Sequence, residues 1–172
     1  MSLGYDLLEQ SKSLATAARG RPKQANLRRA ISSAYYAIYH LLSSETARLF
    51  VREPDFVNIG SLIQRTLVHR EMKRASASIA DGKLPEGIQP DGLSFQPTPH
   101  LKLICKTFIK LQELRHLADY DTSQQFSMGQ TLELIRDTER AFAAWDIVRN
   151  SDEARLYLAC FLLWDTWKKP AR

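Results

Sequence analysis

The sequence has little of what the common enzyme classes depend on. It contains no GxGxxG, P-loop, G-x-S-x-G, HExxH or paired CxxC motif, so nucleotide-dependent, hydrolase-type and zinc chemistry lack their usual sequence support. None of its four histidines is paired with a carboxylate or a second histidine at ligand spacing on one convincing helix face, and we predict no metal site and no cofactor. The two cysteines, Cys105 and Cys160, lie among apolar neighbours at helical spacing, which predicts buried free thiols in a reducing compartment.

Long apolar runs are also missing. No stretch reaches the roughly 18 apolar residues that a membrane span needs, and residues 1–10 lack the basic region and apolar run of a signal peptide. We therefore expect a soluble, cytoplasmic protein with no membrane partner. With 172 residues and 44% hydrophobic content, the chain can bury a sizeable core, and we predict a single helical domain over residues 1–172.

Acidic residues are absent between Gln10 and Ser44, in a chain whose formal net charge is +5. This span holds six basic residues: Lys12, Arg19, Arg21, Lys23, Arg28 and Arg29. A basic patch suits a phosphate-bearing partner, but a solvated basic surface explains the pattern equally well. The candidates for nucleic-acid binding are Arg21, Lys23, Arg28 and Arg29.

The strongest helical pattern runs over residues 25–42, and we expect this helix to continue to about Val51. Its apolar stripe consists of Leu27, Ile31, Ala34, Ile38 and Leu41. At about 100° per residue, this spacing predicts a surface that faces the core. The opposite face carries Arg29, Ser33, Tyr36 and His40. Because an aromatic ring and an imidazole are unusual on a solvated helix back, we expect another surface to pack against Tyr36 and His40.

The rest of the chain has helical periodicity and no convincing strand, which predicts an all-α fold. We expect further helices over about 3–19, 59–80, 99–120 and 127–150, and a last one that begins at 151. Three helix starts have capping signals: Thr98 before Pro99, Ser127 with Gln130, and Ser151. Residues 81–99 contain four of the seven prolines and three of the seven glycines, so they predict a long loop, either functional or a tolerated surface insertion.

A second distinctive stretch is ELRHLADYD, residues 113–121. Arg115 lies seven residues after Phe108, close to the apolar stripe of its helix, and a charge in that place needs a partner. Asp119, four residues further on, lies one turn along the same face. Two interpretations remain open. Arg115 and Asp119 form a structural pair that closes the end of the bundle with Tyr120 over it, or Arg115 is held by Asp119 and offers its free donors to a phosphate.

Two histidines could join such a site. His116 lies about 100° around the helix from Arg115, so the two side chains cannot point the same way. His40, on the back of the helix at 25–42, is the better candidate for a second site group. The alternative is that His40 is a hydrogen-bonded histidine packed in an interface.

Taken together, LRRAISSAYYAIYHLL and the later RHLADYD resemble the HEPN superfamily of small helical bundles. The resemblance is to the bacterial branch with an AYYAxxH-like helix and an RxxADYD-like helix end, and it covers most of the chain. It implies an up-and-down four-helix bundle core with additional helices, usually as a homodimer. Many members are metal-independent endoribonucleases, often toxins paired with a nucleotidyltransferase-like antitoxin, while others only bind RNA, nucleotides or proteins.

In active members of this family an arginine is followed after four to six residues by a histidine. Arg115 matches the arginine, but the positions of the histidine hold Asp119, Tyr120 and Asp121. An aspartate that is already paired with arginine is a poor proton acceptor. His40 could replace the missing histidine only if the fold or a dimer partner brings it near Arg115.

We therefore predict an RNA- or nucleotide-binding, HEPN-like protein of toxin–antitoxin or defence type, and leave open whether it cleaves RNA without a metal. The catalytic candidates are Arg115, Asp119, Tyr120 and His40. A homodimer is expected, with Tyr36 and His40 near its interface, and the resemblance makes a nucleotidyltransferase-like antitoxin a candidate partner. The alternative is a non-catalytic helical module for dimerisation or protein interaction.

Overall fold

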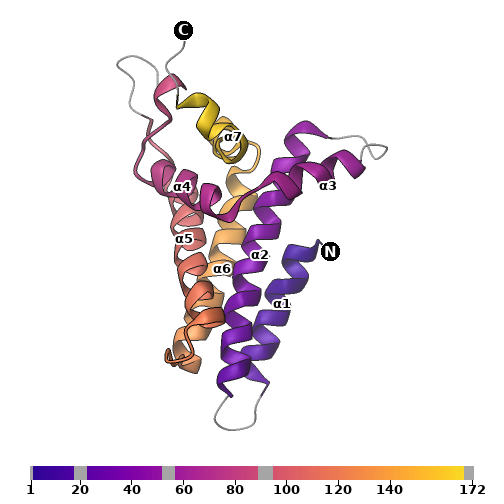
Figure 1. Cartoon of the computed structure of the whole chain (residues 1–172), viewed down its shortest axis with the longest axis vertical. Helices are drawn as coiled ribbons and strands as arrows, with labels where there is room; N and C mark the ends of the chain where they lie inside the picture. The colour runs from indigo at the N-terminus through magenta and orange to yellow at the C-terminus, as the bar shows by residue number, and fades with distance from the viewer. Residues whose placement is uncertain (1, 18–22, 52–56, 89–94, 169–172) are drawn as a thin grey trace. The chain divides into compact units, whose positions relative to one another are not determined.

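The computed structural model describes residues 2–17, 23–51, 57–88 and 95–168. These residues form α-helices and one short 3-10 helix, and they include no strand, so the predicted all-α class is confirmed (Figure 1). The elements, in chain order, are α1 (Leu3–Thr16), α2 (Gln24–Phe50), α3 (Val57–Thr66), α4 (His69–Ala80), the 3-10 helix η2 (Glu86–Ile88), α5 (Pro99–Tyr120), α6 (Met128–Val148) and α7 (Asp152–Trp167).

The chain divides into two compact units. Unit 1 consists of Met1–Leu41 and Thr107–Ala143, and unit 2 of Leu42–Lys106 and Ala144–Arg172. Helices α2, α5 and α6 contribute residues to both units. That the whole chain acts as one domain stays a prediction.

In unit 1, α1 lies antiparallel against the first part of α2. The buried Ser11 hydroxyl donates a hydrogen bond to the carbonyl of Ala30 over 2.7 Å. Near the other end of α1, a Cβ added to Gly4 would lie 2.9 Å from the carbonyl oxygen of Ala37 and 3.3 Å from the amide nitrogen of Leu41. The two helices approach this closely because Gly4 has no side chain.

Ion pairs between side chains join the other helices of unit 1. Lys12 on α1 forms an ion pair of 2.7 Å with Glu139 on α6, and Lys110 on α5 forms one of 2.8 Å with Asp137 on α6. Hydrogen bonds of the candidate site, described below, join α2 to α5. In unit 1, α1 and α5 therefore each contact α2 and α6, as expected in a four-helix core, while the predicted up-and-down arrangement of the whole chain stays a prediction.

The predicted core stripe of α2 is confirmed, since its five members are at most 7% exposed. The three capping signals are confirmed as well. The side-chain oxygens of Thr98 and Ser151 accept hydrogen bonds from the backbone amides three residues later. Ser127 and Gln130 form the reciprocal capping box, with distances of 3.1 and 3.2 Å.

The single helix predicted over 59–80 is wrong. The structure has two helices there, and the chain leaves helical geometry between them at Val68, whose backbone is extended (φ −98°, ψ 123°). Leu67 is 5% exposed, whereas Leu62 in the same predicted stripe is 58% exposed. The predicted stripe therefore spans two helices and the linker between them, in which Leu67 lies.

The predicted loop over 81–99 contains the 3-10 helix η2, which packs against α7, and residues 89–94 lie outside the described residues. Gly82 has a φ of +72°, and a Cβ there would lie 2.8 Å from the carbonyl oxygen of Phe95. The left-handed backbone and the close approach both require glycine at this position.

Unit 2 has its own core between α4 and α7. The buried hydroxyls of Ser76 and Tyr157 are hydrogen-bonded at 2.8 Å. Cys105 and Cys160 are buried free thiols, as predicted, and burial raises the pKa of each to about 12.

Candidate functional site

The candidate site is a cluster in unit 1 between α2 and the last turns of α5. Arg115 Nε lies 2.6 Å from Oδ2 of Asp119, in an ion pair without the alignment of a hydrogen bond. Arg115 Nη2 donates a hydrogen bond of 2.8 Å to the hydroxyl of Tyr36. The side chains of Arg115 and Asp119 are 22% and 28% exposed. The helical spacing therefore predicted the Arg115–Asp119 contact correctly.

Aromatic rings surround the guanidinium group. Its central carbon lies 5.4 to 5.9 Å from the ring centroids of Tyr35, Tyr36 and Tyr120, within the range of cation–π attraction. Burial works against the charge of Arg115, but the neighbouring Tyr36 and Asp119 outweigh it and raise the pKa of Arg115. The arginine is thus a fixed, permanently charged group.

Asp119 is held from a second direction. Its Oδ1 accepts a hydrogen bond of 2.6 Å from the hydroxyl of Ser32 on α2. Sequence reasoning missed Ser32, although it lies four residues before Tyr36 and therefore on the same side of the helix. With Ser32 and Arg115 on its two oxygens, Asp119 orients the arginine.

Tyr120 does not close the end of the bundle. The residue is 65% exposed, and its ring centroid lies 5.0 Å from that of His116, one turn earlier on α5. Sequence reasoning set His116 aside because it points away from Arg115. The structure shows that Tyr120 lies beside both residues, so the exposed edge of the site carries two rings and one guanidinium group.

His40 is half-buried and lies next to the cluster. Its ring centroid is 6.5 Å from that of Tyr36 and 5.3 Å from that of Tyr39. Burial lowers the pKa of His40, which favours the neutral imidazole at neutral pH. His40 is thus joined to Arg115 through Tyr36, and the predicted dimer interface at Tyr36 and His40 stays a prediction.

The four basic candidates differ in their surroundings. The guanidinium group of Arg28 lies 5.6 Å from the ring centroid of Phe126, and it donates hydrogen bonds of 2.5 to 3.5 Å to the backbone carbonyls of Leu117, Ala118, Asp121 and Gln124. It therefore holds the end of α5 and the turn that follows. Lys23 and Arg29 are exposed, and Arg21 lies outside the described residues.

Among the described residues, no three His, Cys, Asp or Glu side chains are grouped so that they could hold a metal ion. None of the described helices combines the length and apolar character needed to cross a membrane.

Comparison with protein-family models, curated proteins and solved structures found no match to this chain. The HEPN relationship therefore stays a prediction.

Proposed function

We propose that this chain is an HEPN-like domain that binds single-stranded RNA, with a nucleotide as its smallest ligand, and that Arg115 contacts a phosphate. One observation carries the proposal. Asp119 and Tyr36 hold the guanidinium group from two sides, while Arg115 Nη1 has no hydrogen-bond partner among the described residues and an exposed Tyr120 lies beside it.

A held arginine beside an exposed aromatic ring is suited to binding a single-stranded nucleic acid. An arginine with a fixed fork can bind a phosphate in a defined direction, and an exposed ring offers a face on which a base stacks, worth about 1–3 kcal/mol per base. Asp119 offsets the charge of Arg115, so the cluster itself is close to neutral. Binding would therefore also need two exposed basic residues, Lys23 just before α2 and Arg29 on α2, and would weaken as salt is raised.

Cleavage is a separate question. In the reaction that the family resemblance implies, Arg115 would stabilise negative charge that develops at phosphorus. The neutral imidazole of His40 is the better candidate to accept the proton of the ribose 2'-hydroxyl, because both oxygens of Asp119 already have partners. The loss of cleavage in His40→Ala with RNA binding retained would assign His40 this role.

The direct test is fluorescence anisotropy with a labelled single-stranded RNA in excess EDTA. We expect Arg115→Ala and Tyr120→Ala each to weaken binding about tenfold, which is about 1.4 kcal/mol. Arg136→Ala is the matched control, since Arg136 is an exposed arginine on α6 of the same unit. Circular dichroism would confirm that the variants are folded, and AMP as competitor would test whether a nucleotide suffices. Unchanged binding by Arg115→Ala, or an equal loss in Arg136→Ala, would refute the proposal.

A protein-interaction module without RNA binding is the second candidate. It is favoured by the rings of Tyr36 and His40, which are only partly covered by the described chain. We expect a homodimer in sedimentation, with His40→Glu shifting it to a monomer because the substitution places a charge among these rings. A dimer that binds no RNA would support this candidate. A nucleotidyltransferase-like antitoxin is the heterologous partner to test by co-purification.

A further inference from the structure

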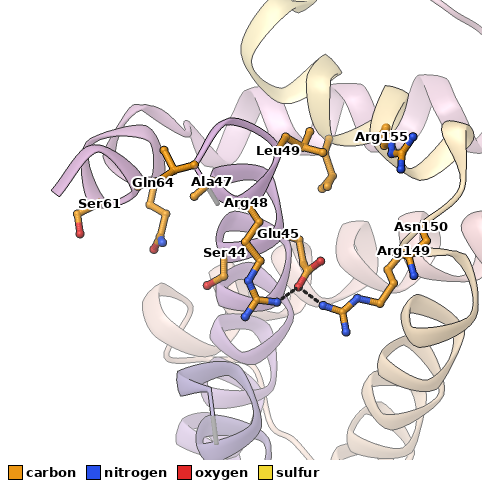
Figure 2. Close-up of a pocket in the computed structure, with 13 residues that line it drawn as sticks. Ser44, Glu45, Ala47, Arg48, Leu49, Ser61, Gln64, Arg149, Asn150 and Arg155 are labelled. Atoms are coloured by element: carbon orange, nitrogen blue, oxygen red, sulfur yellow. Dashed lines mark hydrogen bonds and ion pairs between the residues drawn. The ribbon is translucent and has the colours of Figure 1, made fainter. Parts of the chain in front are cut away.

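Unit 2 contains a cavity of about 900 Å³ that none of the sequence patterns predicted (Figure 2). Its walls come from the end of α2, from α3, and from the junction of α6 with α7. The volume lies in the range of clefts that bind small-molecule ligands.

The charges in its wall are unbalanced. Glu45 is 11% exposed, and its Oε1 lies 2.6 Å from Arg48 Nη1 and 2.8 Å from Arg149 Nη2. Figure 2 shows the two guanidinium groups approaching this single oxygen from different sides. One arginine would have been enough to neutralise Glu45, so the trio carries one positive charge in excess. Asp146 lies 3.9 Å from Arg149 Nη1, but its side chain is 54% exposed and it offsets this charge only weakly.

A third arginine adds to the excess. Arg155 lines the same cavity, and its partner Asp152, 3.2 Å away, has a 98% exposed side chain. Such a surface pair is weak, so Arg155 can exchange its partner for a ligand. The lining residues together carry three positive charges and one negative charge. A phosphomonoester, with about −1.5 to −2 charges near pH 7, balances that excess.

The other walls describe the rest of the ligand. Apolar side chains line part of the cavity: Ala47, Leu49, Val51 and Leu158. Polar side chains that can form neutral hydrogen bonds line another part: Ser44, Ser61, Gln64 and Asn150. A bare inorganic phosphate would leave both of these walls without contacts.

We propose that this cavity binds a small phosphorylated organic ligand of about mononucleotide size. The arginines Arg48, Arg149 and Arg155 receive its phosphate, Gln64 and Ser61 of α3 hydrogen-bond its body, and the apolar wall covers one of its faces. Glu45 positions Arg48 and Arg149 by holding both guanidinium groups on one oxygen. This site is independent of the proposed RNA contact at Arg115.

The test is calorimetric titration of the whole protein with three probes: AMP, adenosine and inorganic phosphate. AMP is expected to bind more tightly than phosphate, and adenosine more weakly than AMP. Arg155→Ala is the informative variant, because it removes one hydrogen-bond donor to the phosphate and leaves the ion pairs of Glu45 intact. We expect it to weaken AMP binding about tenfold, as for the loss of a charge-assisted contact. Arg65→Ala, an exposed arginine on α3 that does not line the cavity, is the matched control and should bind like the wild type.

Three results would overturn the proposal: no heat with AMP, phosphate binding as tightly as AMP, or an equal loss in Arg155→Ala and Arg65→Ala. A parallel titration of Arg115→Ala separates the two sites. AMP binding that is lost with Arg115 and kept in Arg155→Ala would assign the nucleotide to the Arg115 cluster and refute the cavity.

Discussion

Arg28 is a half-buried connection between α2 and the end of α5, and we expect its removal to destabilise the fold more than it weakens phosphate binding. Its Nη1 donates to the carbonyl of Ala118 over 2.8 Å, and its Nη2 donates to those of Asp121 and Gln124 over 2.8 and 2.5 Å. These carbonyls belong to the end of α5 and the turn after it, where the helical ladder of hydrogen bonds ends; that of Asp121 also accepts a longer bond of 3.4 Å from the amide of Gln124. In Arg28→Ala these carbonyls would have to accept hydrogen bonds from water instead.

The size of the effect follows from these contacts. A hydrogen bond from a charged donor contributes about 1.5–3 kcal/mol when buried, and we take about 1 kcal/mol each for the three short bonds because Arg28 is only half-buried. The expected loss is therefore about 3 kcal/mol. For a chain of this length, that lowers the melting temperature by roughly 6–12 °C.

Urea unfolding followed by circular dichroism would measure the loss. The control is Arg29→Ala, which removes the same charge from the neighbouring, exposed position and should stay within about 0.5 kcal/mol of the wild type. Arg28→Lys should recover only part of the loss, since one ammonium group cannot reach three carbonyls as a guanidinium fork does. Equal stability of Arg28→Ala and Arg29→Ala would refute the reasoning.

Further predictions concern other parts of the chain. Gly4→Ala should destabilise the protein by about 1–3 kcal/mol, because the added Cβ meets backbone atoms of α2. Gly129→Ala, where a Cβ meets nothing within 4 Å, should instead stabilise α6 by up to about 1 kcal/mol. Chemical denaturation of the two variants compares these effects, and wild-type stability of Gly4→Ala would contradict the close contact. Cys105 and Cys160 should resist a thiol reagent at pH 8 and react only in denaturant, because burial raises the pKa of both to about 12; rapid labelling of the native protein would be the opposing result. Burial lowers the pKa of His40, so its contribution to stability is present above the unfolded pKa of about 6.5 and is lost as the pH falls through the folded value. Urea midpoints should therefore drop from pH 7.5 to pH 5.5 and drop less in His40→Gln; equal drops would refute this origin.

Features confined to one helix could be predicted from the sequence. The core stripe of α2 and the Arg115–Asp119 contact depend only on residues that lie within a few turns of one another. The helix starts at Thr98, Ser127 and Ser151 also have local signals. The break at Val68 was missed, because a single β-branched residue gives no clear stop signal.

Side-chain partners from other helices could not be predicted. Arg28 had the same apparent role as Arg29 in the sequence, yet only Arg28 meets the end of α5. One of the two interpretations of Arg115 and Asp119 placed Tyr120 over the end of the bundle, whereas Tyr120 is exposed. The ion pair between Glu45 and Arg149 has no local signal in the sequence, because the two residues lie 104 positions apart.

The order and character of the helices, their capping and the i,i+4 contact of Arg115 were already determined by the linear chain, since helical geometry converts short spacings into fixed directions around one axis. Tertiary packing decided the rest. Packing determines which guanidinium groups donate to backbone carbonyls, which share a buried carboxylate and which keep a free donor. The reason is that helix directions and separations arise from the burial of whole helix faces, which brings together residues about a hundred positions apart.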